Sequence, residues 1–378
     1  MEFDVAIVGA GPAGCAAALE LGKLPLRVAL IDRETFPRDK VCGDAIPGPA
    51  VKALAEIDPR YADSLGRLTS ALRSRRTRLY LNGRPPVTLH WETRAYTCRR
   101  TDFDRHLLDL VRAQTNTTVL LGKAVHELAR SEGRVEINLE DGTRCTASGL
   151  IGADGAHSVV ARRLAGQRLD RAHHGGAVRQ YYRGVTGLAP DRLEIHSLRA
   201  FMPGYFWIFP LRDGACNVGF GMHSTALGKG SLRLRHSIAE FIAASPELRE
   251  RFAGANPEDT VRGFGLPFGS RRVRVHGDGF MLAGDAACLI DPLTGDGIGQ
   301  AVGSGLLAAR QAVRCVQSGD WSETATREYA AVLWDRYGSM LRTRSRILDV
   351  HRRLPFLVDW GARALAFGPL RRAVRPYL

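Results

Sequence analysis

Residues 3–32 indicate the fold most clearly, and they read FDVAIVGAGPAGCAAALELGKLPLRVALID. It opens with a short apolar run, FDVAIV, and closes with a second, LRVALI, and each is typical of a strand buried on both faces. Between them lies a glycine turn, followed by Ala, Leu and Cys at helical spacing with Pro12 in the first helical turn. Strand, turn, helix and strand form a βαβ unit, which predicts a parallel sheet.

The turn between the strand and the helix has the pattern GxGxxG. The first glycine permits a tight turn, the second lets a pyrophosphate approach the backbone, and the third lets helix and strand pack closely. The helix N-terminus favours phosphate, and an acid at the end of the second strand can accept hydrogen bonds from ribose hydroxyls. The sequence therefore predicts a dinucleotide site made by Gly9, Gly11, Pro12, Ala13, Gly14, Asp32 and Arg33.

Two later segments also place an acid after a strand-like run. Asp154-Gly155 follows the run at residue 150, and Gly284-Asp285 follows FML and leads into a glycine-rich helix entry. Asp285 can hold a ribose or ribityl hydroxyl, and the backbone amides of the helix entry can face an anionic or electron-accepting ring. These segments add Asp154, Gly155, Gly284, Asp285, Pro292, Gly295, Gly297, Ile298 and Gly299 to the predicted cofactor site.

The three turns, in this order, resemble those of the flavoprotein superfamily of aromatic hydroxylases, and the resemblance extends from residue 1 to about 310. It implies that the cofactor is FAD. The ADP half would bind at the GxGxxG turn and the ribityl chain at the Gly-Asp segment. The chain has only one GxGxxG, so we expect no separate nicotinamide domain. NAD(P)H would then dock transiently, or another electron donor would serve.

Within that superfamily, two stretches are similar to the geranylgeranyl reductase branch. They are FPRDKVCG at residues 36–43 and YFWIFP at residues 205–210 followed by a GFG segment; RTDFD at residues 100–104 matches a further RxxFD segment. The resemblance implies cofactor contacts by Arg38, Cys42, Gly43 and Arg100 and a substrate face made by Tyr205, Trp207, Phe209, Pro210, Gly219 and Gly221. Asp44 departs from the pattern, because relatives often have Cys-Gly-Gly there. The halogenase branch has a GES-type segment at this loop, which disfavours halogenation.

Two interpretations of these residues stay open. Cys42 lies near Arg38 and Lys40, and nearby positive charge activates thiols, so it is a candidate catalytic proton donor or flavin contact. The alternative is an inert small residue that close packing against the cofactor requires. The aromatic residues of 205–210 alternate, so they share one face of a strand, which either lines a substrate pocket or packs into a core.

The function that this pattern predicts is an FAD-dependent reductase. It would saturate carbon–carbon double bonds of an isoprenoid or other hydrophobic small molecule, with the flavin supplying hydride. The alternative is an FAD monooxygenase or dehydrogenase of a specialised-metabolism substrate on the same scaffold.

Composition excludes several other classes. The 378 residues are 45% hydrophobic and 24% charged, which is incompatible with a disordered or disulfide-stapled chain. The seven cysteines lack CxxC spacing and no His, Cys, Asp and Glu set has metal spacing, so we expect reduced thiols and no metal. No apolar run reaches the roughly 18 residues of a membrane span and the N-terminus lacks a signal-peptide pattern, so we expect a cytoplasmic protein.

The net charge of +14 is concentrated near the C-terminus. Residues 336–378 contain ten Arg and two Asp, interleaved with large apolar residues. This favours either peripheral contact with a membrane surface or a helical cap with solvated arginines. No nucleic-acid recognition motif accompanies the charge, so nucleic acid is not an expected partner. The oligomeric state has no signal in the sequence.

The fold class expected is α/β with α+β elements: a Rossmann-like FAD-binding domain, an antiparallel-sheet substrate domain and C-terminal helices. Parallel-type segments occur at both ends of the chain, with a more antiparallel region between them. We therefore assign residues 1–75, 99–170 and 276–330 to the FAD-binding domain, 76–98 and 171–275 to the substrate domain, and 331–378 to a C-terminal helical segment.

Overall fold

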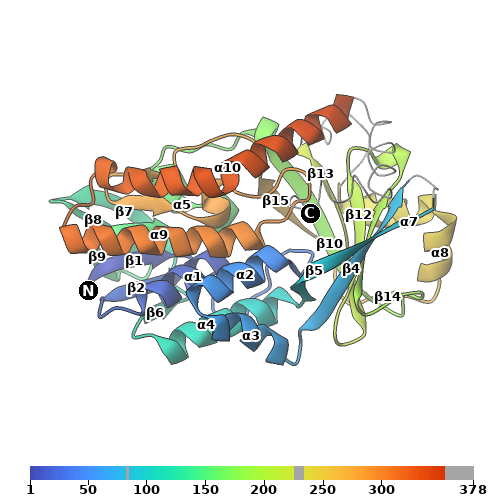
Figure 1. The fold of residues 1–378 in the computed structure, drawn as a ribbon, viewed down its shortest axis with the longest axis horizontal. Coiled ribbons are helices and arrows are strands. Elements are labelled where there is room, and N and C mark those ends of the chain that lie inside the picture. Colours follow the sequence, from blue (N-terminus) through green and yellow to red (C-terminus); the bar gives the residue numbers. More distant parts are fainter. Residues whose placement is uncertain (82–84, 225–233, 354–378) are drawn as a thin grey trace.

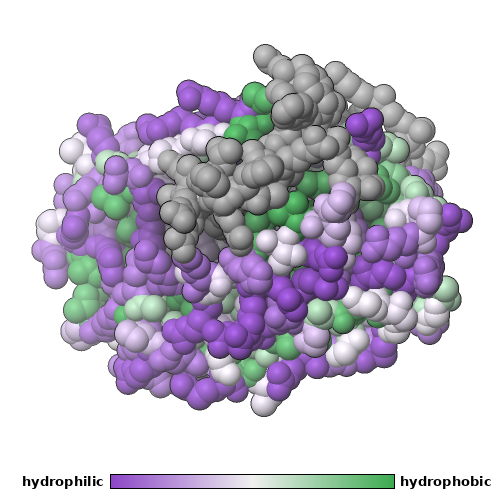
Figure 2. All heavy atoms as spheres, turned by 45° about the vertical axis from the view of Figure 1, so that its right-hand side comes forward, coloured by the Kyte–Doolittle hydropathy of each residue, from purple (hydrophilic) through white to green (hydrophobic). Residues whose placement is uncertain are grey.

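Two β-sheets lie side by side along the longest axis of the molecule (Figure 1). The computed structural model describes residues 1–81, 85–224 and 234–353. Helices pack around the first sheet, and the second sheet forms the other end of the molecule (Figure 1). The surface on the side of the second sheet is mainly hydrophilic, with small apolar patches (Figure 2).

The first sheet, which we call the parallel sheet, has the strand order β16-β17-β9-β1-β2-β6, with β7 and β8 continuing from β9. β1 lies between β2 and β9 and is parallel to both, as the βαβ pattern predicts. The strands are β1 (Glu2–Val8), β2 (Val28–Asp32), β6 (Thr118–Leu121), β7 (Val125–Ser131), β8 (Arg134–Leu139), β9 (Arg144–Gly152), β16 (His276–Gly277) and β17 (Phe280–Leu282).

Helices cover this sheet closely because small residues let their backbones approach. A Cβ atom on Gly305 of α9 would lie 2.1 Å from the carbonyl oxygen of Ala13 in α1, so only glycine permits this crossing. The helices around this sheet are α1 (Pro12–Leu21), α2 (Gly48–Ile57), α3 (Pro59–Arg67), α4 (Arg100–Gln114), α5 (Val159–Arg163), α9 (Ile298–Ser318) and α10 (Glu323–Arg353), whereas α7 (Ser237–Ala244) and α8 (Pro246–Phe252) lie at the second sheet.

The second sheet, which we call the large sheet, has the order β14-β10-β13-β12-β11-β4-β5-β3, with β15 pairing with β10. Its pairs are antiparallel except β11 with β4. Its apolar core includes Phe206, Phe220 and Phe241, and Phe206 stacks on Phe241 with ring centroids 4.7 Å apart. The strands are β3 (Ala45–Ile46), β4 (Leu72–Leu81), β5 (Val87–Thr97), β10 (His174–Arg183), β11 (Arg192–Ser197), β12 (Tyr205–Pro210), β13 (Ala215–His223), β14 (Asn256–Pro257) and β15 (Arg262–Pro267).

The division between the sheets differs in detail from the segment boundaries that the sequence predicts. β3 and the first residues of β4 belong to the large sheet, although they fall within the segment 1–75. They join it because β3 and the start of β4 both pair with the end of β5. Asn82-Gly83, between β4 and β5, is a dipeptide that predicts a hairpin turn, and it lies outside the described residues.

The long helix α10 packs along α9, as Figure 1 shows. Two arginines of α10 form ion pairs with acids elsewhere in the chain. Arg336 pairs with Glu56 at 2.8 and 2.9 Å, and Arg344 pairs with buried Asp291. In the part of the chain that the structure describes, no helix combines the length and apolarity needed to cross a bilayer. Residues 354–378 of the predicted 336–378 segment lie outside the described residues.

Candidate functional site

The glycine turn after β1 is built by close backbone contacts. Gly9 has a φ of +103°, and a Cβ on Gly14 would lie 1.8 Å from the Gly9 carbonyl oxygen. The N-cap of α1 is Gly11, which has no side chain to occupy the free amides of the first helical turn. These amides are therefore available to an anion such as a pyrophosphate.

Asp32 lies at the end of β2 beside this turn. Its carboxylate accepts hydrogen bonds from the Ala10 amide at 2.7 Å and the Glu34 amide at 2.9 Å, one on each oxygen. Each oxygen keeps a second lone pair for a ribose hydroxyl. The predicted neighbour Arg33 is exposed and pairs with Glu34 at 3.3 Å.

Two arginines share one buried carboxylate next to the turn. Arg100 binds Asp104 with two hydrogen bonds of 2.7 Å, and Arg38 Nη1 lies 3.1 Å from the same carboxylate. Burial lowers the pKa of Arg100, but the Asp104 carboxylate outweighs this effect and raises that pKa above its usual value. The cluster of two cations and one anion leaves one net positive charge at the site.

Arg38 supports the fit of a phosphate-containing cofactor. Its Nη2 lies 3.4 Å from where a Cβ on Gly11 would stand. Its Nη1 faces the Asp104 carboxylate, which holds the guanidinium in place. A fixed positive charge over a glycine, at a helix N-terminus without a capping side chain, suits a phosphate oxygen. The residues at this turn therefore fit the dinucleotide half of FAD.

The two other predicted turns lie beside the first. A Cβ on Gly9 would lie 2.3 Å from the Ala153 carbonyl oxygen, and a Cβ on Gly284 would lie 3.3 Å from the Cβ of Ala13. The three turns thus meet at the carboxyl ends of adjacent strands β1, β9 and β17. In open α/β sheets this edge is where ligands bind.

Asp154 and Asp285 have different surroundings. The Asp154 carboxylate accepts hydrogen bonds from Ser158 at 2.5 Å and from the Val159 amide at 2.6 Å, so it caps the start of α5. Burial raises its pKa. Gly155 next to it faces open space. Asp285 lies 3.5 Å from Lys40 Nζ, and the N-cap of α9, Gly297, lies beside its Oδ1.

The three aromatic residues of the predicted substrate face lie together on one face of β12. The ring centroids of Tyr205 and Trp207 are 5.9 Å apart, and those of Trp207 and Phe209 are 6.2 Å apart. Phe206 and Ile208, which alternate with them, belong to the apolar core of the large sheet, whereas the three aromatic residues are not members of it. The three aromatic residues therefore lie on the face of β12 opposite to the apolar core of the large sheet.

One predicted substrate residue, Gly219, makes room for the indole. A Cβ on Gly219 would lie 2.0 Å from the Trp207 ring, whereas one on Gly221 would lie 3.6 Å from it, an ordinary contact distance. The ring therefore lies over β13 where Gly219 leaves space. Pro210 contributes its carbonyl oxygen, which accepts a hydrogen bond from the Thr97 hydroxyl at 2.5 Å.

The Cys42 loop contacts both the cofactor side and this aromatic face. Cys42 lies close enough to Arg100, at the glycine turn, to contribute to the raised pKa of that guanidinium. A Cβ on Gly43 would lie 3.1 Å from the Phe209 ring and 3.4 Å from the Trp207 Nε1. The loop thus joins the two regions that the sequence assigns to cofactor and substrate.

The segment that enters α9 closes the other side of the aromatic face. Tyr205 donates a hydrogen bond of 2.5 Å to the Thr294 carbonyl oxygen and lies against Gly295. Burial raises the pKa of Asp296, in the same segment, to about 6. The remaining predicted residues here, Pro292, Ile298 and Gly299, lie in this segment or at the start of α9.

Several residues at the site escaped the sequence analysis. Asp104 lies within the quoted RTDFD segment, and its role follows from the spacing of four residues that puts it on the same helix face as Arg100. Tyr181 and Asn217 lie on β10 and β13 and hydrogen-bond Asp44. No local pattern marks them, because each is a single polar residue in a strand.

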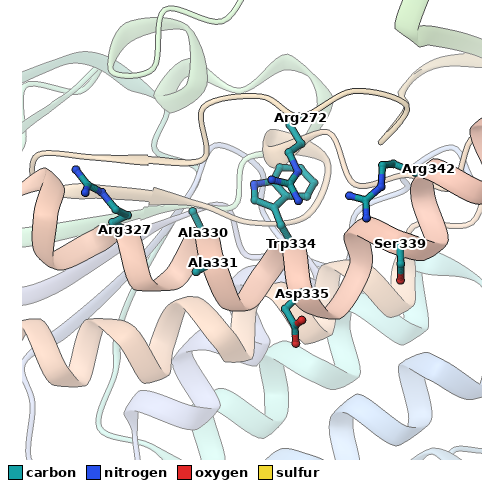
Figure 3. Close-up of a pocket in the computed structure, with 8 residues that line it drawn as sticks. All are labelled: Arg272, Arg327, Ala330, Ala331, Trp334, Asp335, Ser339 and Arg342. Carbon is teal, nitrogen blue, oxygen red and sulfur yellow. The ribbon is translucent and has the colours of Figure 1, made fainter.

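A separate surface hollow of about 600 Å³ lies on α10 (Figure 3). Figure 3 shows Arg272 over the ring of Trp334, and the guanidinium carbon lies 5.5 Å from the ring centroid. The residues that line it are Arg272, Arg327, Ala330, Ala331, Trp334, Asp335, Ser339 and Arg342, none of which belongs to the predicted cofactor or substrate site.

Comparison with known proteins agrees with this architecture. A family model described as pyridine nucleotide-disulphide oxidoreductase matches residues 3–193. Menaquinone reductase of Mycobacterium tuberculosis is 35% identical, over 97% of this chain and 86% of the relative. Digeranylgeranylglycerophospholipid reductase of Thermoplasma volcanium is 27% identical, over 89% of this chain and 84% of the relative.

Among solved structures, a geranylgeranyl bacteriochlorophyll reductase-like protein of Thermoplasma acidophilum has a TM-score of 0.80 at 23% identity, covering 100% of this chain and 99% of that one. The halogenase PltM in complex with phloroglucinol and FAD has a TM-score of 0.74 at 19% identity, covering 86% and 72%. These two likenesses show the shared Rossmann-like fold. Taken with the sequence relatives, they establish that this chain belongs to the geranylgeranyl reductase family of FAD-dependent oxidoreductases.

Proposed function

We propose that this enzyme saturates carbon–carbon double bonds of an isoprenoid or another hydrophobic substrate. The observation that carries the proposal is the position of the Cys42-Gly43 loop, which contacts both Arg100 at the cofactor turn and the aromatic face of β12. A hydrophobic chain lying on that face would be next to the flavin side of the site. The relatives' names suggest a menaquinone or a geranylgeranyl lipid as the first substrates to test.

The chain's own residues divide the work around the cofactor. Bound and reduced, FAD supplies a hydride. Tyr205, Trp207 and Phe209 bind the hydrophobic substrate and exclude water from it. Cys42 supplies the proton that the second carbon requires, and the positive charge of nearby Arg100 stabilises the thiolate that forms. The thiolate that remains regains its proton from solvent.

The electron donor is also part of the proposal. The sequence has one GxGxxG, and the three nucleotide turns of the structure converge on one site. We therefore propose that NAD(P)H docks transiently or that another carrier reduces the flavin. Stopped-flow mixing of the holoenzyme with NADH or NADPH checks this, because bleaching of the flavin absorbance would identify the donor.

The decisive experiment is an anaerobic assay. Holoenzyme reduced chemically with dithionite is mixed, without oxygen, with a menaquinone or a geranylgeranyl lipid, and the product is analysed by mass spectrometry. We expect one added pair of hydrogens per oxidised flavin. A reaction that requires oxygen would overturn the proposal in favour of the alternative, an FAD monooxygenase.

Cys42→Ala and Cys42→Ser test the proton donor in the same assay. We expect the single-turnover rate to fall by about a hundredfold in both variants while FAD remains bound, the lower range for loss of a general acid. Unchanged turnover would assign Cys42 to packing against the cofactor. Cys288→Ala, at the other partly exposed cysteine, is the matched control.

We also propose that residues 336–378 contact a membrane surface, where a hydrophobic substrate would be found. In the described part of this segment and next to it, Arg342, Arg327 and Arg272 line the hollow that contains Trp334 (Figure 3). A ring at the interface with arginines around it suits a headgroup layer. Co-sedimentation with anionic and with neutral vesicles tests this. Binding to neither kind of vesicle would leave the helical cap as the role of α10.

A further inference from the structure

Asp44 is a buried acid inside the candidate site. Its side chain is fully buried, and its backbone has a φ of +63°. Oδ2 accepts hydrogen bonds from the Tyr181 hydroxyl at 2.7 Å and from Asn217 Nδ2 at 2.8 Å. Oδ1 has no hydrogen-bond partner among the described residues. A buried carboxylate oxygen without a hydrogen-bond donor lowers the stability of the fold, so the protein retains Asp44 for a reason other than stability.

Asn217 connects Asp44 to the rest of the site. Its Nδ2 also donates a hydrogen bond of 2.8 Å to the Cys42 carbonyl oxygen, and its Oδ1 accepts one of 2.8 Å from Trp207 Nε1. The opposite orientation of this amide would face its oxygen toward two other oxygens and its NH₂ group toward the indole N–H. Asp44 and Cys42 therefore fix the amide, and the amide fixes Trp207.

We propose that Asp44 is a positioning residue of the reductase site, which acts through Asn217 to hold the Cys42 turn against Trp207. This role rests on the function proposed above, because it sets where the proton donor and the substrate face stand relative to each other. Asp44 itself need not touch substrate or cofactor. A glycine at this position could not make these contacts, because it has no side chain.

The pH dependence of stability offers a signature of this carboxyl. Burial raises the pKa of Asp44 to about 6, against hydrogen bonds from Asn217 and Tyr181 and the charges of Arg179 and Arg100, which lower it. The Cys98 thiol also faces the carboxyl. Because the folded pKa lies above the unfolded value, the stability that this group contributes is fully present below the unfolded pKa and is lost as the pH rises through about 6. At neutral pH the ionised Asp44 therefore destabilises the fold.

Two substitutions separate charge from geometry. Asp44→Asn keeps an oxygen that can accept both hydrogen bonds and removes the charge, whereas Asp44→Gly removes the acceptor and tolerates the positive φ. Asn217→Leu breaks the same connection from the other side, and guards against a failure of Asp44→Gly to fold. All three are compared with the wild-type protein without substrate.

The main readout is the rate at which iodoacetamide alkylates Cys42, followed by peptide mass mapping. We expect it to rise about tenfold in Asp44→Gly and in Asn217→Leu, as for the loss of one hydrogen bond to a charged group, and to stay near wild type in Asp44→Asn. Cys288 is the internal control, because it is the other partly exposed cysteine and should react equally in every variant. Wild-type alkylation rates in both Asp44→Gly and Asn217→Leu would overturn the proposal.

The second readout is the melting temperature. We expect Asp44→Asn to melt above wild type at about pH 8 and to lose that advantage at about pH 5, where the wild-type carboxyl is largely protonated. An equal difference in melting temperature at both pH values would show that the Asp44 carboxyl does not titrate in this range. It would overturn the pH dependence of stability inferred for Asp44. Neither readout uses a substrate, so both stand even if the anaerobic assay overturns the reductase function.

Anaerobic single turnovers with the substrate identified above complete the test. We expect Asp44→Gly to lower the rate of the chemical step with FAD binding unchanged, and Asp44→Asn to restore it. Equal loss in both variants would assign the effect to charge and overturn a positioning role.

Discussion

The two sheets form their parts of the candidate site by different means. At the parallel sheet the backbone forms it, because a Cβ on Gly9 or Gly14 would overlap a neighbouring carbonyl group and Gly284 has a φ of +62°. At the large sheet buried polar side chains form it, with Asn217 in the middle of β13, whose residues are all buried. A backbone site fails when any side chain is added, whereas a side-chain site fails when one partner is removed.

The strongest way to break this comparison is to add a side chain at the glycine turn. Gly14→Val should abolish folding or flavin binding, because its Cβ would lie 1.8 Å from the Gly9 carbonyl oxygen. Soluble yield and bound flavin absorbance measure this. Gly254→Ala is the matched control, since a Cβ there meets nothing within 4 Å. Normal flavin content in Gly14→Val would mean that the turn can move aside.

A smaller effect is expected from removing a buried cation beside the turn. Arg100→Met leaves buried Asp104 with Arg38 as its remaining charged partner, which should lower the free energy of unfolding by about 3 kcal/mol. Urea denaturation measures the loss. Arg105→Met on the same helix, whose ion pair with Asp109 is half-exposed, should change it by less than about 1 kcal/mol. Equal effects would show that burial does not distinguish the two pairs.

The large sheet contains a buried ion cluster around Glu194. The stability that this cluster contributes should fall in acid. Burial raises the pKa of Glu194, but His196, Arg251 and Arg192 outweigh burial and lower it to about 2. The folded pKa lies below the unfolded value, so the stabilising effect is present above about pH 4.5 and is lost as the pH falls through about 2. Glu194→Gln should cost about 2 kcal/mol at neutral pH, because it leaves Arg251 without its buried partner.

The measurement is urea denaturation at several pH values. The wild-type protein should lose stability more steeply than Glu194→Gln across that acidic range. Exposed Glu240→Gln should follow the wild-type curve. Parallel curves for wild type and Glu194→Gln would place the acid sensitivity elsewhere.

The smallest effect concerns the contact of α10 with the helices below it. Arg336→Ala removes a two-bond pair with Glu56, and both side chains are 29% exposed. We expect a loss of about 1 kcal/mol that shrinks with added salt, because partly exposed ion pairs are screened. Thermal melting at low and high salt checks this. A loss that does not depend on salt would point to packing by the arginine stem.

The same contrast explains what could be predicted from the sequence. The parallel sheet and its turns were predictable because strand, glycines and acid lie within about 30 consecutive residues. The fold class and the family are confirmed; the assignment of individual residues to cofactor and substrate stays a prediction. The Asp44 network was not predictable, since Tyr181 and Asn217 lie 137 and 173 positions away in the chain. Their proximity depends on how the residues just before β3 meet β10 and β13 of the large sheet, which no local pattern encodes.

The discontinuous parallel sheet also has a consequence for synthesis on the ribosome. β1 is made first, yet its neighbour β9 ends at Gly152, and β17 and α9, which complete the cofactor edge, begin at Phe280 and Ile298. The first glycine turn can therefore contact the later turns and α9 only after most of the chain has been synthesised. We therefore expect the chain to capture its flavin only after α9 has been synthesised.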